Sequence, residues 1–323
     1  MEYNQSKLYG LKSKKLLSYY LCFPSKDYFK QDFVAKQIHP CLDYQNGKAR
    51  LLEKPKYELG QIQKRLKTLL AELDTPDYVF SGVKGRSYVD NAKMWHYGNR
   101  YLYKIDLTAF FPSITRESVY SFYKTTLNTS SDIAELLTNL TTVDLDLTVT
   151  QPEEMSQINS FLNSKSVNTR NHLISGSSPS QLLSYHVNSE MFDKLNCISK
   201  ESSMSMTIYV DDIIFSSSRF ISNKIIRRIN SVIKSYGYML SIKKVKLHSK
   251  NYPKRVTGVI INSHGEVSIP NALQFKIYLE FYYLRNHPDD KKVAERLYGR
   301  IVSARQIIPD AFPSIYQYAR KYL

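Results

Sequence analysis

Short apolar runs on either side of two acidic residues form the most distinctive pattern in the chain. Residues 206–216 read Met-Thr-Ile-Tyr-Val-Asp-Asp-Ile-Ile-Phe-Ser, which predicts two buried strands with Asp211 and Asp212 at the tight connection between them. A further short strand is predicted over residues 102–106 and ends at Asp106. Two aromatic residues, a proline and the polar start of a helix follow it.

Helical spacing marks five further segments. Gly176 permits a turn that other residues resist, and Pro179 suits the first turn of a helix. Apolar residues four positions apart then predict one face of a single amphipathic helix: Leu183, Val187, Met191 and Leu195. Similar periodicity predicts helices over residues 61–73, 221–236, 273–285 and 291–308, with Pro309 and Pro313 breaking the last pattern.

Adjacent carboxylates in apolar surroundings are costly to bury unless a positive charge meets them. A divalent cation is a suitable partner because hard cations prefer oxygen ligands. The alternative is that Asp211-Asp212 only fills a turn, since aspartate favours turns through local hydrogen bonds. For Asp106 the alternative is an edge turn over a core.

Three of these segments, in this order, resemble the palm motifs of reverse transcriptases. They are Asp106 with Phe110-Phe111-Pro112-Ser113, then residues 176–180, then residues 209–212. Four more blocks extend the resemblance from about residue 45 to 262. Residues 50–63 resemble the basic fingers segment, and residues 80–96, with Asn91-Ala92 and His96, resemble the block before the first catalytic strand. Lys243-Lys244-Val245 resembles the lysine motif beyond the palm, and residues 255–260 contain a Val-Thr-Gly triplet typical of retron enzymes.

The chain departs from the retron pattern at three places. Ser175 stands where that pattern has a glutamine, and three residues rather than two separate Ala92 from His96. A polar insertion also spans about residues 141–167. The resemblance is therefore to a bacterial reverse transcriptase of the retron and phage-defence group, with the subgroup open.

Membership of that group implies an α+β, right-hand polymerase fold with fingers, a palm built from an antiparallel sheet plus helices, and a small helical thumb. We expect an N-terminal extension over residues 1–45, fingers over 46–100, a palm over 101–262 with a fingers insertion at about 115–175, and a thumb over 263–323. No length remains in this division for a separate nuclease domain.

The family's chemistry is an in-line displacement at phosphorus supported by two divalent ions about 4 Å apart. Mg²⁺ is the expected cofactor, with Mn²⁺ as a substitute, because it takes oxygen ligands from a few carboxylates, waters and phosphates. By resemblance, Asp106, Asp211 and Asp212 are the catalytic and metal-binding residues. Asp106 and Asp211 are the expected shared ligands, and Asp212 is the acid in the second sphere or on the primer side.

The resemblance also implies residues that handle the nucleotide. Phe111 occupies the position whose ring excludes a ribose 2′-hydroxyl, with core packing as the alternative. Arg50 and either Lys48 or Lys54 are candidates for the incoming triphosphate, because a guanidinium fork matches phosphate oxygens. Lys244 is expected to assist the leaving pyrophosphate. The alternatives are an exposed basic strand for the first three and a solvated turn lysine for Lys244.

Template and primer contacts are expected at the small residues before the central helix. Gly176, Ser178 and Pro179 form a platform for a sugar or base, and Tyr209 is expected beside the primer. An ordinary entry from a loop into a helix is the alternative.

The composition of the chain favours binding to a polyanion. The chain has 45 Lys and Arg against 29 Asp and Glu, a net charge of +16 and a pI near 9.5, which favours nucleic acid. The 26 tyrosines add aromatic faces that can stack on bases. Three widely spaced cysteines form neither a metal-ligand pattern nor a disulfide framework, which fits a cytoplasmic protein. We expect no signal peptide and no membrane-spanning segment.

Three functions remain open at this point. The first is an RNA-directed DNA polymerase that makes cDNA from a dedicated non-coding RNA, in anti-phage defence and with a possible effector protein. The second is template-independent or protein-primed DNA synthesis at the same site. The third is a catalytically silent RNA-binding scaffold, against which the three intact acids argue. RNA template, DNA product and dNTPs are the expected partners of the first.

Overall fold

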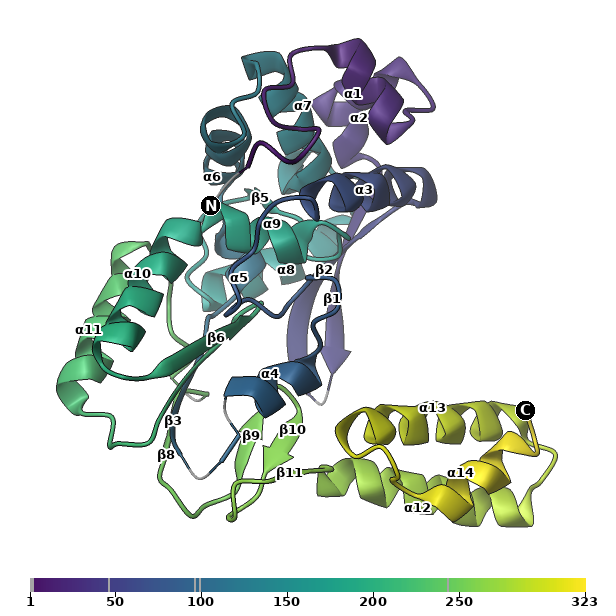
Figure 1. Ribbon diagram of the computed structural model, residues 1–323. Coiled ribbons are helices and arrows are strands. Elements are labelled where there is room, and N and C mark those ends of the chain that lie inside the picture. The colour runs from purple at the N-terminus through teal and green to yellow at the C-terminus, as the bar shows by residue number, and fades with distance from the viewer. Residues whose placement is uncertain (1–2, 46, 96, 99, 243) are drawn as a thin grey trace.

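In the computed structural model, the described part of the chain comprises residues 3–45, 47–95, 97–98, 100–242 and 244–323. His96 and Lys243, which belong to two of the motifs above, lie outside the described residues. Helices and strands are mixed throughout (Figure 1), as the α+β prediction requires.

A central antiparallel sheet carries the acidic residues. In the described part of the chain its strand order is β6-β7-β3-β8. The two strands predicted around Asp211-Asp212 and the strand predicted before Asp106 are therefore confirmed. The strands are β3 (Tyr101–Asp106), β6 (Ser205–Tyr209), β7 (Asp212–Ser217) and β8 (Lys246–His248).

The two faces of this sheet pack against different elements. Alternate residues of β3 and β7, such as Tyr103 and Phe215, belong to the larger hydrophobic core, and the Tyr103 hydroxyl donates to Asn230 Oδ1 at 2.8 Å. Leu102 and Ile214 face the opposite side and join a second core. The helices on the first side are α10 (Ser189–Glu201) and α11 (Asn223–Ser235), and α4 (Tyr88–Trp95) lies on the second.

The single helix predicted after Pro179 is wrong in one respect, because two helices occupy the segment. α9 (Ser180–Val187) ends at Asn188, where the backbone leaves the helical region, and α10 begins at the next residue. Asn188 donates to the Ser184 carbonyl and accepts a hydrogen bond from the Tyr238 hydroxyl at 2.6 Å. Because an asparagine side chain competes for backbone groups, it divides a stripe that apolar periodicity alone joins.

A long β-hairpin projects beside the sheet (Figure 1). Its strands are β1 (Ile38–Gln45) and β2 (Lys48–Pro55), paired antiparallel. The domain boundary predicted at residue 45 therefore falls between two paired strands. Helices gather above the base of the hairpin: α1 (Lys14–Leu21), η1 (Lys26–Phe29), α2 (Gln31–Ala35), α3 (Tyr57–Leu70), α6 (Arg116–Ser121), η2 (Phe122–Thr126) and α7 (Ser131–Thr141).

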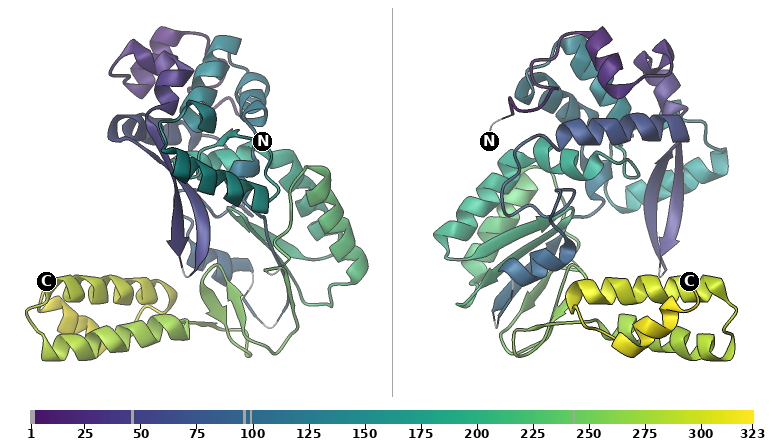
Figure 2. Two further views of the ribbon diagram at one scale, coloured as in Figure 1. Left: turned by 180° about the vertical axis from the view of Figure 1, so that it is seen from behind. Right: turned by 45° about the vertical axis from the view of Figure 1, so that its right-hand side comes forward.

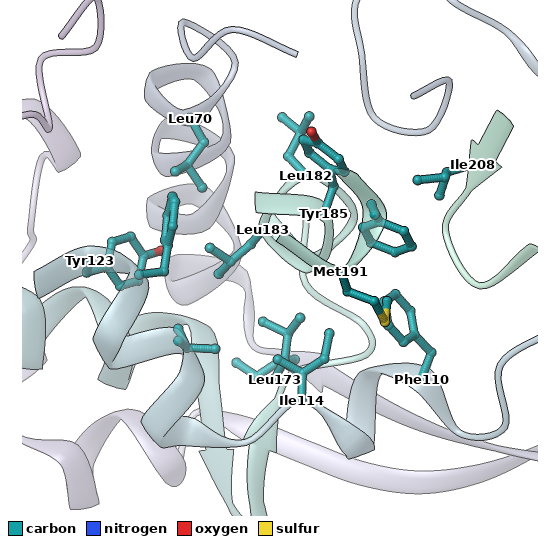
Figure 3. Packing of buried hydrophobic residues seen from close by; sticks show 14 of the residues in the cluster. Leu70, Phe110, Ile114, Tyr123, Leu173, Leu182, Leu183, Tyr185, Met191 and Ile208 are labelled. Carbon is teal, nitrogen blue, oxygen red and sulfur yellow. The ribbon is translucent and has the colours of Figure 1, made fainter. Parts of the chain in front are cut away.

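The polar insertion folds into regular structure. β4 (Thr142–Asp144) pairs with β5 (Asn171–Leu173), and η3 (Leu145–Leu147) and α8 (Pro152–Ser164) lie between them. The larger hydrophobic core contains residues from segments that are far apart in sequence. In Figure 3, Leu173 lies beside Ile114 below Leu183, and Met191 lies next to Phe110.

The C-terminal part is a small helical bundle that stands apart from the sheet (Figures 1 and 2). The helices predicted over 273–285 and 291–308 are confirmed, and Pro313 starts a third helix at its first turn. The buried Glu280 ties two helices together through Arg296 and Arg300. The elements are β9 (Lys254–Val256), β10 (Val259–Ile261), β11 (Val267–Ser268), α12 (Asn271–Asn286), α13 (Lys291–Ile307) and α14 (Pro313–Arg320). Over the stretch that the structure covers, no helix combines the length and the apolar character needed to cross a membrane.

Candidate active site

Strand pairing brings the three predicted acids to one end of the sheet. Asp106, the last residue of β3, lies directly opposite Asp212, the first residue of β7. Directly opposed residues have Cβ atoms about 5 Å apart and point to the same face. Asp211 occupies the two-residue turn before β7, and its carbonyl accepts a hydrogen bond from the Leu107 N–H at 3.0 Å. Two distant segments thus place three carboxylates side by side.

The turn that presents Asp211 has an unusual backbone. Val210, its first residue, has φ of +59°, a region that a β-branched residue rarely adopts. Two-residue hairpin turns need positive φ at this position, which glycine normally supplies. A non-glycine residue there stores on the order of 1–3 kcal/mol of strain, and such strain clusters at functional sites.

Lysine side chains hold two of the three acids. The Lys244 ammonium donates to both oxygens of Asp106, at 2.7 and 2.8 Å. The Lys104 ammonium donates to Asp212 Oδ2 at 2.7 Å. Lys104 lies two residues before Asp106 on the same strand, so both side chains share one face of the sheet.

Burial and mutual repulsion perturb the acids. Burial raises the pKa of Asp211 to about 6, and the neighbouring carboxylates of Asp106 and Asp212 add to the shift. Burial likewise raises the pKa of Asp106, although the hydrogen bond from Lys244 opposes this effect. Carboxylates with pKa values perturbed in this way cluster at functional sites.

The donor chemistry of this site suits a divalent cation, although no preformed cage is present. Among the described residues, no three His, Cys, Asp or Glu side chains are arranged to hold a metal ion. In this arrangement Lys244 contacts both oxygens of Asp106, and Lys104 contacts one oxygen of Asp212. Three clustered carboxylates offer the hard oxygen donors that Mg²⁺ prefers, so these residues fit the ion.

Phe111 lies close to the acids in sequence and at the edge of the core. It belongs to α5 (Phe110–Ser113), which starts after Ala109, a residue with φ of +46°. Phe110 is buried, whereas Phe111 is half-buried and packs against the core with its ring 6.0 Å from that of Phe110. Phe111 therefore combines a packing contact with an accessible edge.

The residues predicted to contact template and primer differ in exposure. Gly176 lies against β2, where a Cβ atom would sit 2.2 Å from the Glu53 carbonyl oxygen. Ser178 is half-buried, and the buried Pro179 precedes α9. Tyr209 is half-buried and pairs with Asp212 across the hairpin, which puts it on the face that carries the acids. Gly176 is thus required because the backbone of β2 approaches it too closely for any side chain, which is a packing constraint.

The predicted triphosphate residues share one side of β2. Lys48, Arg50 and Lys54 are exposed, whereas Leu51 and Glu53, at odd positions of the strand, are buried. Alternation along a strand explains this division. These three cations are separate from the acid cluster in sequence and belong to a different sheet.

Sequence reasoning missed three side chains of this region. Lys104 was detectable, because a period of two places it on the face of Asp106. Glu53 and His172 had no sequence signal, since their contact joins residues 119 positions apart.

Comparison with known proteins adds an independent finding. Residues 37–261 match the family model described as reverse transcriptase (RNA-dependent DNA polymerase). The chain is 26% identical over 228 residues to the retron Se72 reverse transcriptase of Salmonella heidelberg (strain 579083-10), covering 68% of this chain and 53% of that protein. It is 25% identical over 225 residues to the retron Ec83 reverse transcriptase of Escherichia coli, covering 68% and 66%. The chain thus spans about half the length of the Salmonella relative.

Solved structures with a similar arrangement are more distant. A foamy viral protease-reverse transcriptase in complex with double-stranded DNA matches with a TM-score of 0.46 and 17% identity, over 83% of this chain and 35% of that one. Telomerase from Candida albicans, in complex with a fragment of telomeric RNA, matches with a TM-score of 0.40 and 13% identity, over 96% and 60%.

Proposed function

The chain belongs to the reverse transcriptase family, and from this premise we propose that it is an RNA-directed DNA polymerase of the retron type. The register that sets Asp106 opposite Asp212, with Asp211 in the adjoining turn, is the observation that supports this activity best. Lys104, Lys244 and the strained turn at Val210 lie at the same acid cluster, in which the pKa of Asp211 is raised.

The proposed metal ligands are Asp106 and Asp211, with Asp212 beside them and paired to Lys104. Bound Mg²⁺, or Mn²⁺ in its place, would supply charge stabilisation for the attacking and leaving oxygens at phosphorus. Lys244, whose exposed ammonium donates to Asp106, is the residue that would assist the leaving pyrophosphate. Phe111 excludes a ribose 2′-hydroxyl by contact, and Arg50 with either Lys48 or Lys54 receives the triphosphate.

The chain's parts take the roles of a right hand in this proposal. The hairpin β1–β2 and residues up to 100 form the fingers, so that the fingers begin at Ile38 rather than at residue 46. The sheet is the palm, and α12–α14 are the thumb. Exposed aromatic side chains on α12, among them Phe275 and Tyr282, support a thumb that lies against a template–primer duplex.

We further propose that the template is a dedicated non-coding RNA, that the protein acts in the bacterial cytoplasm, and that it serves anti-phage defence with an effector protein. The net charge of +16 supports the RNA partner, and three free cysteines among the described residues support a reducing compartment. Sequencing the nucleic acid that copurifies with the protein tests the template directly.

Replacement of Asp211 by alanine is the central test of activity. Purified protein is given Mg²⁺, labelled dNTPs and copurified RNA, and the DNA product is measured. We expect Asp211→Ala to lower synthesis by at least about 10³-fold while RNA binding stays nearly unchanged, because the lost carboxylate holds metal rather than RNA. Asp289→Ala, an exposed acid between α12 and α13, is the matched control.

A second activity at the same site is favoured by one observation. Ser175, which stands where the retron pattern has glutamine, directs its hydroxyl to the Leu51 carbonyl at 3.0 Å and so faces β2. Reduced template contact at this point would permit template-independent or protein-primed synthesis. DNA product that still forms when the protein is treated with ribonuclease before the reaction indicates this second activity, and product that requires the RNA contradicts it. Absence of product under both conditions leaves the RNA-binding scaffold.

A further inference from the structure

A fully buried carboxylate joins the hairpin to the core of the protein. Glu53 on β2 and His172 on β5 are both 0% exposed, and the His172 Nε2–H donates to Glu53 Oε1 at 2.7 Å. The other oxygen of Glu53 accepts the Ser175 N–H at 2.8 Å and lies 3.1 Å from the Ser175 hydroxyl. Because a buried charge is costly without such donors, the carboxylate holds β2 and residues 172–175 in one arrangement.

Backbone contacts make this junction tight. Gly176 leaves no space for a side chain, because a Cβ atom there would meet the Glu53 carbonyl oxygen at 2.2 Å. The Glu53 N–H also donates to the Ser175 hydroxyl at 3.2 Å. Any shift of β2 relative to residues 175–176 therefore breaks several contacts together.

The junction lies between the two halves of the proposed nucleotide site. On one side, the strand that contains Glu53 carries Lys48, Arg50 and Lys54 on its opposite, exposed face. On the other side, the Leu173 N–H donates to the Ile114 carbonyl at 3.0 Å, directly after α5, which contains Phe111. Figure 3 shows Leu173 and Ile114 packed next to each other.

We propose that Glu53, together with His172 and Ser175, is a positioning set that fixes the triphosphate-binding strand relative to Phe111 and thereby sets nucleotide affinity and sugar selection. This inference rests on the proposed polymerase function. None of the three side chains contacts the nucleotide in this account. Their effect passes through the placement of β2 and α5, which sets where the triphosphate and the sugar are bound.

Replacement of Glu53 by methionine tests the proposal. Methionine fills a similar volume but accepts no hydrogen bond, so that the donors of His172 and Ser175 lose their partner. We expect Glu53→Met to raise the KM for dNTPs by about tenfold with little change in kcat, and to lower discrimination against rNTPs. Glu53→Gln is expected to lie between wild type and Glu53→Met, since its carbonyl oxygen can still accept the Ser175 N–H while its NH2 donates to Nε2 of the other His172 tautomer.

Gln63→Met is the matched control. Gln63 is also 0% exposed and donates one hydrogen bond, to the Leu140 carbonyl at 2.9 Å, but it belongs to α3. We expect it to lower the melting temperature without changing KM or sugar discrimination.

The outcomes separate the inference from the function on which it rests. Wild-type protein that makes no DNA contradicts the polymerase function itself. Active wild type with unchanged KM and discrimination in Glu53→Met, or with equal changes in Gln63→Met, overturns the positioning role. Should Glu53→Met fail to fold, Ser175→Ala, which deletes a single oxygen, decides the question: a two- to threefold rise in KM, about 0.5 kcal/mol, supports the role, and no change overturns it.

Discussion

Asp211 meets two opposed requirements within one turn. In the proposed metal site it must ionise to bind the ion, whereas its burial and the carboxylates of Asp106 and Asp212 disfavour ionisation and raise its pKa to about 6. Without a cation, the ionised carboxylate therefore destabilises the folded protein, and a bound cation would offset this cost. This conflict leads to a prediction about stability as well as one about activity.

Asp211→Asn is expected to stabilise the metal-free protein near pH 7.5. An acid whose pKa rises from 3.8 to about 6 on folding destabilises the folded state fully above pH 6 and not at all below about pH 3.8. Removing the charge recovers on the order of 3 kcal/mol at pH 7.5. Thermal melting with EDTA measures the gain, which should shrink as pH falls below 6. Mg²⁺ should then stabilise wild type more than the variant. A variant that melts at or below wild type in EDTA contradicts this prediction.

The pH dependence of synthesis should follow the same group. Since the proposed metal ion would bind the ionised carboxylate, we expect kcat/KM at limiting Mg²⁺ to fall as pH drops through about 6. Raising the Mg²⁺ concentration should shift the midpoint to lower pH. A profile that is flat between pH 5 and 7.5 would exclude Asp211 as the titrating ligand.

Phe111 allows a test of sugar selection. We expect Phe111→Val to increase ribonucleotide incorporation at least about tenfold relative to dNTPs, because the smaller side chain removes the clash with a 2′-hydroxyl. Single-nucleotide incorporation with dNTPs and rNTPs measures the ratio, and Phe220→Val, at an exposed phenylalanine just after β7, is the control. Unchanged selectivity would leave Phe111 with a packing role only.

At the scale of the elements, the contact between β2 and the turn before α9 fixes the position of the β1–β2 hairpin relative to the core. Gly176→Ala places a Cβ atom 2.2 Å from the Glu53 carbonyl oxygen, so the backbone must move. Overpacking of this kind costs about 1–3 kcal/mol. We expect Gly176→Ala to have a lower melting temperature in thermal unfolding and a higher KM for dNTPs in steady-state kinetics than wild type.

Gly299→Ala is the control for this glycine. It lies within α13 with no atom inside 4 Å of the added Cβ, so the substitution should stabilise by up to about 1 kcal/mol through helix propensity. Equal destabilisation of the two variants would show that the clash at Gly176 is relieved by other adjustments.

For the whole molecule, the net charge of +16 should govern RNA affinity. Each phosphate contact releases counterions, so we expect the affinity to fall by at least about 100-fold between 50 and 200 mM salt. Filter binding across a salt series, with RNA of random sequence for comparison, measures the slope. A shallow slope would indicate that base contacts and stacking dominate the interaction.

Local patterns along the chain determined much of this protein. Apolar runs around Asp106 and Asp211-Asp212 predicted the strands of the palm, because a side chain's preference for a buried strand depends on its neighbours in sequence. The motif order identified the family, and the periodicity beyond Pro270 predicted two thumb helices. The predicted helix over residues 61–73 is displaced to Tyr57–Leu70, an error of a few residues at each end.

Only the tertiary structure decided which distant residues meet. Asp106 lies opposite Asp212, Lys244 holds Asp106, and Glu53 pairs with His172, although more than 100 positions separate the members of each pair. Such contacts depend on strand register and on how elements pack, and neither quantity is encoded by the residues adjacent to each partner. The sequence therefore determined the kinds of groups available to the site, and the fold determined which charges neutralise one another there.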